Sequence, residues 1–399
     1  MVSDQTPPAG GVSISGRDRL AVWALAVAQT IGYACFFYIF AALVLSWHRD
    51  LGWDESILSL GPLLAILVTA LVSPRVGRLV DQGNALRLMG GGTLVGAISL
   101  CTLALATHPA VFLLAFAGLG AASATSLYEV CFALMIRRFG DRARTAITKV
   151  TLVAGLASTL AFPAGAWLSD AFGWRVAVWC AAFAVLGLML PLQLWGASQL
   201  GGGRPRGGVP EVVPERWRVL LAKPGAMRLM ILFALLNLDH WMIVNLFRPI
   251  MDRMAVSDGW AILAASLIGP SQVAGRMALM VTGDRLGANS AARMTVAAMV
   301  LAATCLLFAG QWAWALVAFA VLQGAAMGVL TILRPVLVAG ANGPRNYAAA
   351  AALIGLPALA AVAIAPSFGT ALLDLGGPTL LISTALGLAI LSLATLSKA

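Results

Sequence analysis

Long apolar stretches, separated by charged or Pro/Gly-rich residues, dominate the hydrophobic pattern of this chain. Each stretch is long enough for a transmembrane α-helix, which needs about 20 predominantly apolar residues. We therefore expect an all-α, polytopic membrane protein with twelve transmembrane helices. The pattern predicts these spans near residues 20–46, 56–76, 85–106, 110–136, 146–168, 174–195, 227–248, 259–281, 290–309, 312–338, 347–372 and 378–396.

A longer hydrophilic segment divides the spans into two sets of six. It mixes glycines, prolines and arginines, a composition typical of a flexible linker. The predicted organisation is a cytosolic tail at residues 1–19, a six-helix bundle at 20–196, a cytosolic linker at 197–226 and a second six-helix bundle at 227–399.

Short sequence matches relate the two halves to each other. Leu-Gly-Pro at residues 60–62 matches Ile-Gly-Pro at 268–270, and Cys101 matches Cys305 at nearly the same shift. Transporters that alternate around a central site are commonly built from such repeats. We therefore expect two pseudo-symmetric bundles.

Composition excludes a soluble protein. Only 11% of the residues are charged and the mean hydropathy is +0.91, whereas a soluble domain carries roughly 25% charged residues. The five cysteines lie in apolar stretches without C-x-x-C spacing or a histidine cluster, so we expect no metal site and no cofactor.

The net charge of +10 comes from arginines in small groups between the apolar stretches. Because Lys-rich tracts and basic faces with interleaved aromatics are absent from the sequence, we expect no nucleic-acid partner. With the N-terminus inside, 20 of the 26 Lys and Arg residues face the cytoplasm and 4 face outward. The positive-inside rule therefore predicts a protein of the cytoplasmic (inner) membrane with both termini cytosolic.

Two short loops carry a recognisable motif. Residues 77–83 read GRLVDQG and 283–287 read GDRLG, and each loop is followed by an arginine, Arg87 or Arg293. They resemble the G-x-L-a-D-r-x-G-r-r loop of the major facilitator superfamily, at both positions where that family carries it. The first loop departs from the motif, since it is one residue short and has Gln82 where arginine is usual. The resemblance implies the superfamily's fold of two six-helix bundles.

We expect the two motif loops to act as cytosolic gates. A carboxylate at a helix end can accept hydrogen bonds from a neighbouring helix N-terminus and from nearby arginines. Breaking such a cluster would favour opening on the cytosolic side, whereas solvated end charges would contribute little. The candidate gating residues are Gly77, Asp81, Arg87, Gly283, Asp284 and Arg285.

Few ionisable residues lie deep in the predicted spans, and each is a functional candidate because an unpaired charge there is costly. The resemblance implies that spans 1, 4, 7 and 10 line a central cavity, and four of the five candidates fall on these spans. The five are Glu129, Asp239, His240, Arg276 and Arg334. We expect Arg276, near the cytosolic end of its span, to extend its side chain to that surface.

Glu129 and Arg334 occupy matching places in the two halves, within a residue of the repeat shift. We expect an ion pair across the cavity, which a proton on Glu129 or an anionic substrate on Arg334 could split. A purely structural pair is the alternative. Pro335 removes the N–H that would bond the Thr331 carbonyl, so a kink is expected there that exposes backbone groups to substrate.

Two further sites complete the predicted pathway. Asp239 and His240 are about 100° apart on a helix, so one is expected to face the cavity and carry protons. A hydrogen-bonded pair that orients span 7 is the alternative. In span 1, Gln29 and Tyr33 offer hydrogen bonds and a stacking surface to a substrate, or serve in packing.

These features predict a secondary active transporter that works by alternating access, is coupled to protons, and carries an organic anion or another small polar metabolite. A proton-driven exporter of drugs or toxic compounds, a channel, and a non-transporting receptor or scaffold remain alternatives. Enzyme motifs such as H-E-x-x-H and G-x-S-x-G do not occur. The expected partners are a small-molecule substrate, protons and the lipid bilayer, and we expect a monomer. The sequence leaves import and export open.

Overall fold

The computed structural model describes residues 15–201, 217–282, 285–343 and 346–397, which are helical with short connections and contain no strand. The N-terminal bundle is built from ten α-helices and short π or 3-10 turns. Its α-helices are α1 (Gly16–Gly32), α2 (Ile39–Leu51), α3 (Glu55–Leu79), α4 (Ala85–Ala104), α5 (Pro109–Ser126), α6 (Tyr128–Phe139), α7 (Ala143–Ala154), α8 (Ala157–Phe172), α9 (Trp174–Ala184) and α10 (Leu190–Gln199).

The C-terminal bundle follows the linker and has fewer, longer helices. The short helix α11 (Trp217–Ala222) precedes it. The bundle itself consists of α12 (Pro224–Asn245), α13 (Phe247–Arg253), α14 (Asp258–Thr282), α15 (Ala288–Leu307), α16 (Ala313–Asn342) and α17 (Tyr347–Ser397).

Twelve membrane crossings follow from ten apolar helical segments. Eight of the ten are 20 to 36 residues long, which suits a single crossing. The other two, Ser56–Ala104 and Tyr347–Leu396, have 49 and 50 residues and are too long for one. Each contains glycine with non-helical dihedral angles, Gly83 in the first and Gly376 and Gly377 in the second, where the chain reverses. The predicted twelve-helix, all-α membrane fold is confirmed.

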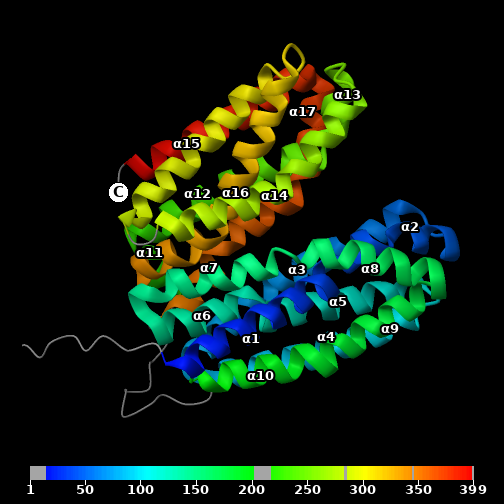
Figure 1. Ribbon diagram of the computed structural model, residues 1–399, viewed down its shortest axis with the longest axis vertical. Helices are drawn as coiled ribbons and strands as arrows, with labels where there is room; N and C mark the ends of the chain where they lie inside the picture. The colour runs from blue at the N-terminus through cyan, green and yellow to red at the C-terminus, as the bar shows by residue number, and fades with distance from the viewer. Residues whose placement is uncertain (1–14, 202–216, 283–284, 344–345, 398–399) are drawn as a thin grey trace, which may run out of the picture.

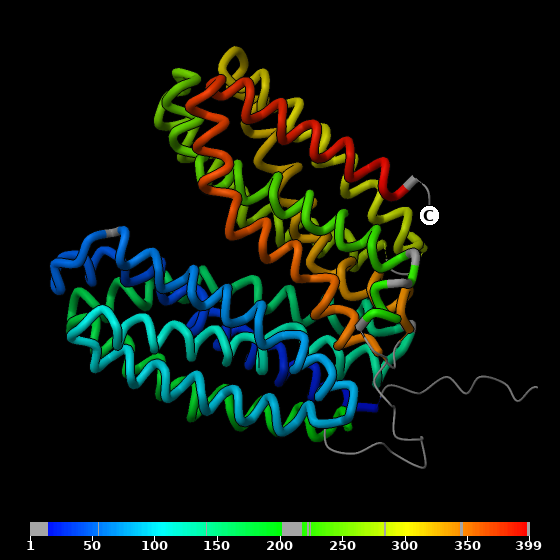
Figure 2. Tube along the Cα trace, turned by 180° about the vertical axis from the view of Figure 1, so that it is seen from behind, coloured from blue at the N-terminus to red at the C-terminus, as the bar shows by residue number. Residues whose placement is uncertain are grey.

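The two bundles meet at one end of the molecule and diverge toward the other (Figures 1 and 2). The C-terminal end of α17 lies at the end where they meet, which we name the converging end (Figure 1). Helices α2 and α13 lie at the opposite, diverging end (Figure 1).

The clusters of buried apolar side chains follow the division into two bundles. One cluster of buried side chains is shared by both bundles, and includes Leu25 and Met135 from the first and Ile332 and Val338 from the second. Two further clusters belong to one bundle each. Apolar side chains also cover the outside, as a surface in contact with lipid requires: Leu45, Val281 and Leu375 are 76%, 82% and 81% exposed.

Candidate functional site

The fourth span is interrupted where it enters the centre of the molecule. Helix α5 ends at Ser126, Leu127 adopts extended dihedral angles (φ −91°, ψ −155°), and α6 begins at Tyr128. The Ser126 carbonyl accepts hydrogen bonds from the side-chain amides of Gln29 (3.0 Å) and Gln193 (2.5 Å). The break therefore leaves this carbonyl with side-chain donors from α1 and α10.

Gln29 is fully buried in this network and does not face solvent. Thr93 extends the network, because its hydroxyl lies 2.5 Å from Gln193 Oε1. The sequence analysis missed Thr93 and Gln193. Their only signal is that both are polar residues inside apolar spans, which alone does not distinguish a packing role from a functional one.

Glu129 sits in the first turn of α6, directly after the break. Its Oε1 lies 2.9 Å from Arg334 Nη2 on α16, so one ion pair joins the two bundles. The side chains are 38% and 31% exposed, which leaves the pair open to a solute or water. The predicted ion pair is present, and its role in transport stays a prediction.

Aromatic rings lie close to this pair, beside Glu129 along α6 and near Arg334 in space. The rings of Tyr33 and Tyr128 lie 4.4 Å apart, and Tyr128 stacks on Phe132 at 4.7 Å. The guanidinium carbon of Arg334 lies 5.9 Å from the centre of the Phe233 ring. Tyr33 is half-buried at the start of a π-helical turn in the first span. The charged pair is thus flanked by surfaces that can contact the carbon part of a solute.

Helix α16 runs through Pro335 without interruption, from Ala313 to Asn342. The Thr331 hydroxyl donates to the Gly328 carbonyl at 2.7 Å within the same helix. We expected the proline to expose backbone groups, but α16 has no break at Pro335. The span that breaks with an extended residue, Leu127, is the fourth, which carries Glu129 and has no proline at its break.

Asp239 and His240 on α12 are both buried, at 1% and 4% exposure. The Gln323 amide nitrogen on α16 lies 3.0 Å from Asp239 Oδ2 and 3.5 Å from His240 Nδ1. Although the two residues are adjacent, both approach the same amide group. Asp239 Oδ1 has no hydrogen-bond partner among the described residues. This cluster lies within the C-terminal bundle, whereas the Glu129–Arg334 pair lies between bundles.

Arg276 does not extend to the surface as expected, but is 5% exposed and reaches the other bundle. Its Nη1 donates to the Thr151 carbonyl on α7 at 3.0 Å, and its Nη2 lies 3.4 Å from Gln272 Oε1. Gly155 makes room for it, since a Cβ there would lie 2.3 Å from Nη1. Among the described residues, no carboxylate forms an ion pair with Arg276.

Asp81 joins the bundles at the converging end. Its carboxylate accepts hydrogen bonds from the backbone N–H groups of Ala348 (3.1 Å) and Ala349 (2.8 Å), in the first turn of α17. Gly77 permits this approach, because a Cβ there would lie 2.4 Å from the Ala348 carbonyl oxygen. Charge-assisted bonds to a helix N-terminus are among the stronger hydrogen bonds in proteins. The motif loop thus makes the contact with a neighbouring helix that its sequence predicts.

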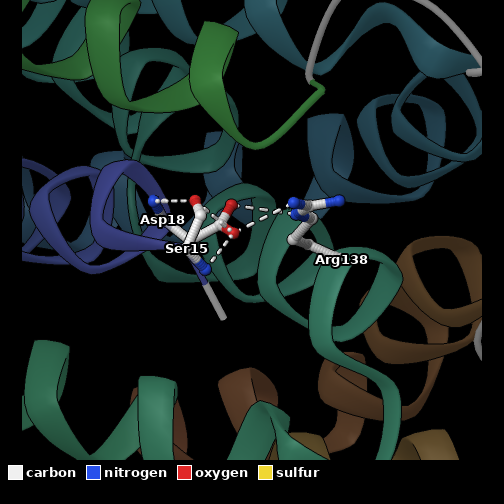
Figure 3. A network of polar contacts seen from close by, with 3 residues as sticks. All are labelled: Ser15, Asp18 and Arg138. Atoms are coloured by element: carbon white, nitrogen blue, oxygen red, sulfur yellow. Dashed lines mark hydrogen bonds and ion pairs between the residues drawn. The ribbon is translucent and has the colours of Figure 1, made fainter. Parts of the chain in front are cut away.

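The arginines around this loop differ from those expected. Arg137 donates to the carbonyls of Val80 (2.9 Å) and Asp81 (3.3 Å), whereas Arg87 is exposed. The adjacent Arg138 forms two parallel hydrogen bonds of 3.0 Å with the Asp18 carboxylate at the start of α1 (Figure 3). These contacts fix the end of span 4 to the motif loop and to span 1.

Ser15 and Asp18 also cap helix α1 reciprocally, as Figure 3 shows. Their spacing of three is the sequence signature of a capping box, and it could have identified this group of residues.

The second motif loop accepts a hydrogen bond from the other bundle. Arg144 Nη1 on α7 donates to the Leu286 carbonyl at 2.7 Å. Arg285 is exposed. Gly283 and Asp284, the other predicted gating residues of this loop, lie outside the described residues.

Comparison with known proteins places this architecture in a family. The sequence model of the Major Facilitator Superfamily matches residues 25–313. The chain belongs to the major facilitator superfamily. This superfamily consists of membrane transporters, so the fold and the family both support membrane transport. No curated protein matches the sequence.

Two solved structures show the same superfamily fold. The crystal structure of the human organic anion transporter MFSD10 (TETRAN) matches with a TM-score of 0.72 and 16% identity, over 95% of this chain and 99% of that one. The crystal structure of a bacterial homologue of the iron transporter ferroportin, in an outward-facing state, matches with a TM-score of 0.73 and 14% identity, over 96% and 98%. At such identities the likeness establishes the fold.

Proposed function

We propose that this superfamily member is a proton-coupled secondary transporter of organic anions that works by alternating access. The observation that carries the proposal is the Glu129–Arg334 ion pair, which joins the two bundles and is partly exposed. A contact between bundles must change when they rock against each other. A charge pair at that place therefore couples the occupancy of the site to the conformation.

We propose that Arg334 exchanges its partner, from the Glu129 carboxylate to a carboxylate of the solute, so that its charge stays balanced. A proton on Glu129 removes the partner of Arg334, and a carboxylate of the solute then takes its place on the guanidinium. Arginine suits this role because its planar group binds carboxylates through two parallel hydrogen bonds. Arg276 adds a second cation, which is buried and whose described partners are neutral oxygens. Within this group of three residues, the two arginines outnumber the single carboxylate, Glu129, by one, which favours an anionic solute.

The described conformation fits one half of a transport cycle. The bundles meet at the end where Asp81 binds α17, and diverge at the other (Figure 2). If the positive-inside orientation holds, the converging end is cytosolic and the conformation faces outward. The fold likeness to a protein crystallised in an outward-facing state agrees with this assignment.

The test is uptake by purified protein in proteoliposomes, with an imposed pH gradient and a panel of radiolabelled mono- and dicarboxylates. We expect at least one organic anion to accumulate when the outside is acidic, and a protonophore to abolish the accumulation. Glu129→Gln should lose accumulation but retain exchange of labelled for unlabelled solute, because the neutral side chain resembles the protonated state.

Asp374→Asn is the matched control. It neutralises a carboxylate that pairs with Arg253 at 2.9 Å in an exposed position, away from the centre. If neither the pH gradient nor the protonophore changes the uptake, proton coupling is excluded. Uptake of cationic drugs but of no anion would instead support the drug-exporter alternative, and no flux for any solute would support a receptor.

A further inference from the structure

A cavity of about 270 Å³ lies at the junction of the two bundles near the converging end. Its walls come from α3 of the N-terminal bundle, α17 of the C-terminal bundle and the short linker helix α11. It is lined by Leu71, Pro74, Arg75, Arg78, Leu220, Ala349 and Leu353. The Glu129–Arg334 pair contributes nothing to these walls, so the cavity is separate from the proposed transport site.

Two cations mark one side of this cavity. Arg75 and Arg78 lie three residues apart, and therefore on one face of α3. Both are exposed, and neither forms an ion pair with a carboxylate of the described residues. They lie at the predicted end of span 2, the depth at which lipid headgroups begin.

The remaining walls are apolar. Leu220, Ala349 and Leu353 form a small buried cluster of their own, at 2%, 3% and 7% exposure. Leu71, one helical turn before Arg75, is 71% exposed on the outer surface. A ligand that fits both the basic and the apolar walls has an anionic group, which contacts the arginines, and a hydrocarbon chain, which continues along Leu71.

We propose that this cavity binds an anionic phospholipid, with the phosphate on Arg75 and Arg78 and the acyl chains leaving past Leu71. Basic pockets between transmembrane helices bind acidic headgroups in this way. A soluble phosphate would meet the same arginines but would leave the apolar walls without a partner. The occupant is therefore a lipid of the leaflet at the converging end, whichever side of the membrane that is.

The lipid would join the two bundles. It contacts α3 on one side and α17 on the other, and Ala349, which lines the cavity, donates its N–H to Asp81. Separation of the bundles at this end would pull the two walls apart. A bound anionic lipid therefore favours the conformation in which the converging end is closed.

Native mass spectrometry and thermal denaturation of delipidated protein in detergent would test the site. The probes are phosphatidylglycerol, phosphatidylcholine with the same acyl chains, and water-soluble glycerol phosphate. We expect phosphatidylglycerol to bind more tightly and to raise the melting temperature more than the other two. Arg75→Gln/Arg78→Gln should weaken its binding by roughly tenfold or more, since each arginine near an anionic headgroup adds to the attraction.

Arg17→Gln/Arg19→Gln is the matched control, because it removes two exposed charges that do not line the cavity. Arg75→Lys/Arg78→Lys retains both charges and should retain the preference for phosphatidylglycerol. An equal loss in the control pair would mean that only net charge matters and would overturn the proposal. Equal effects of glycerol phosphate would identify a phosphate site instead, and equal effects of phosphatidylcholine would remove the role of the arginines.

Discussion

Polar contacts between the bundles differ in kind from those inside a bundle. Between bundles, each contact uses a charged side chain: Glu129 with Arg334, Asp81 with two backbone N–H groups, and Arg276 with a carbonyl. Inside the bundles, the deeply buried networks centre on the side-chain amides of Gln193 and Gln323, of which the second also binds the Asp239 carboxylate. The charged pair Asp18–Arg138 lies at a helix end.

This difference indicates which polar contacts can break and re-form during a transport cycle. A charge that loses a protein partner at a wet surface can be solvated or take up a solute, so such a contact can break and re-form. An amide buried among apolar side chains has no such replacement, and its loss costs stability. Contacts between bundles are therefore suited to switching, and those within bundles to holding the helices in register.

Gly77→Val should change the contact between bundles most. The first added atom would lie 2.4 Å from the Ala348 carbonyl oxygen, on the backbone of α17. Overpacking of this kind costs about 1–3 kcal/mol, so the closed converging end should become roughly 5- to 150-fold less populated relative to the open one. Distances between spin labels at Arg19→Cys and Asn289→Cys, one exposed site on each bundle, should lengthen.

Gly91→Val provides the matched control for this measurement. It makes the same substitution in α4, where nothing lies within 4 Å of an added Cβ. Unchanged label distances in Gly77→Val would show that the approach of α17 is not limited by this glycine.

Asp81→Asn tests the same contact with a smaller change. The amide keeps one oxygen acceptor but loses the negative charge that faces the first turn of α17. The expected cost to the closed converging end is about 1 kcal/mol, or roughly fivefold, as for other charges at helix N-termini. The same spin-label distances measure it, and Asp50→Asn, an exposed carboxylate on α2, is the control. A full loss of the closed state would place more energy in this contact than its two hydrogen bonds explain.

The features that could be predicted from the sequence are those set by apolar length, by the repeat of the two halves or by a local motif. The twelve spans follow from apolar length, and the Glu129–Arg334 pair follows from the repeat shift, because two similar bundles place equivalent residues at equivalent depths. The Asp81 contact follows from a motif at a helix end.

Features that depend on partners far along the chain were not predictable. The break after Ser126 has no glycine or proline to signal it, and its carbonyl is satisfied by amides 97 and 67 residues away. The direction of Arg276 depends on Gly155 in the other bundle, which leaves room for the guanidinium. A long side chain can reach either the surface or a neighbour, and only the packed structure decides between them.

Asp239→Asn, inside a bundle, and Glu129→Gln, between bundles, should change the stability in opposite directions. The buried carboxylate accepts one hydrogen bond, from Gln323, and its Oδ1 has no partner among the described residues. The amide can still accept from Gln323 and removes the cost of burying a charge, so the melting temperature should rise by about 2 °C. Glu129→Gln, which leaves Arg334 without its partner, should lower it slightly. A fall for Asp239→Asn would show that this carboxylate has a stabilising partner in solution.

Gln193→Met should have the smallest effect, because the Ser126 carbonyl keeps its second donor, Gln29. The thioether fills a similar volume but cannot donate, and Thr93 can still bond the Met89 carbonyl at 2.8 Å. A fall of about 1 °C in the melting temperature is expected. Adding Gln29→Leu would leave the carbonyl without either side-chain donor, so the double variant should lose more than the sum of the two single variants. Additive losses would mean that another group, such as water, already satisfies the carbonyl, and the two glutamines would then be packing residues rather than the support of the broken span.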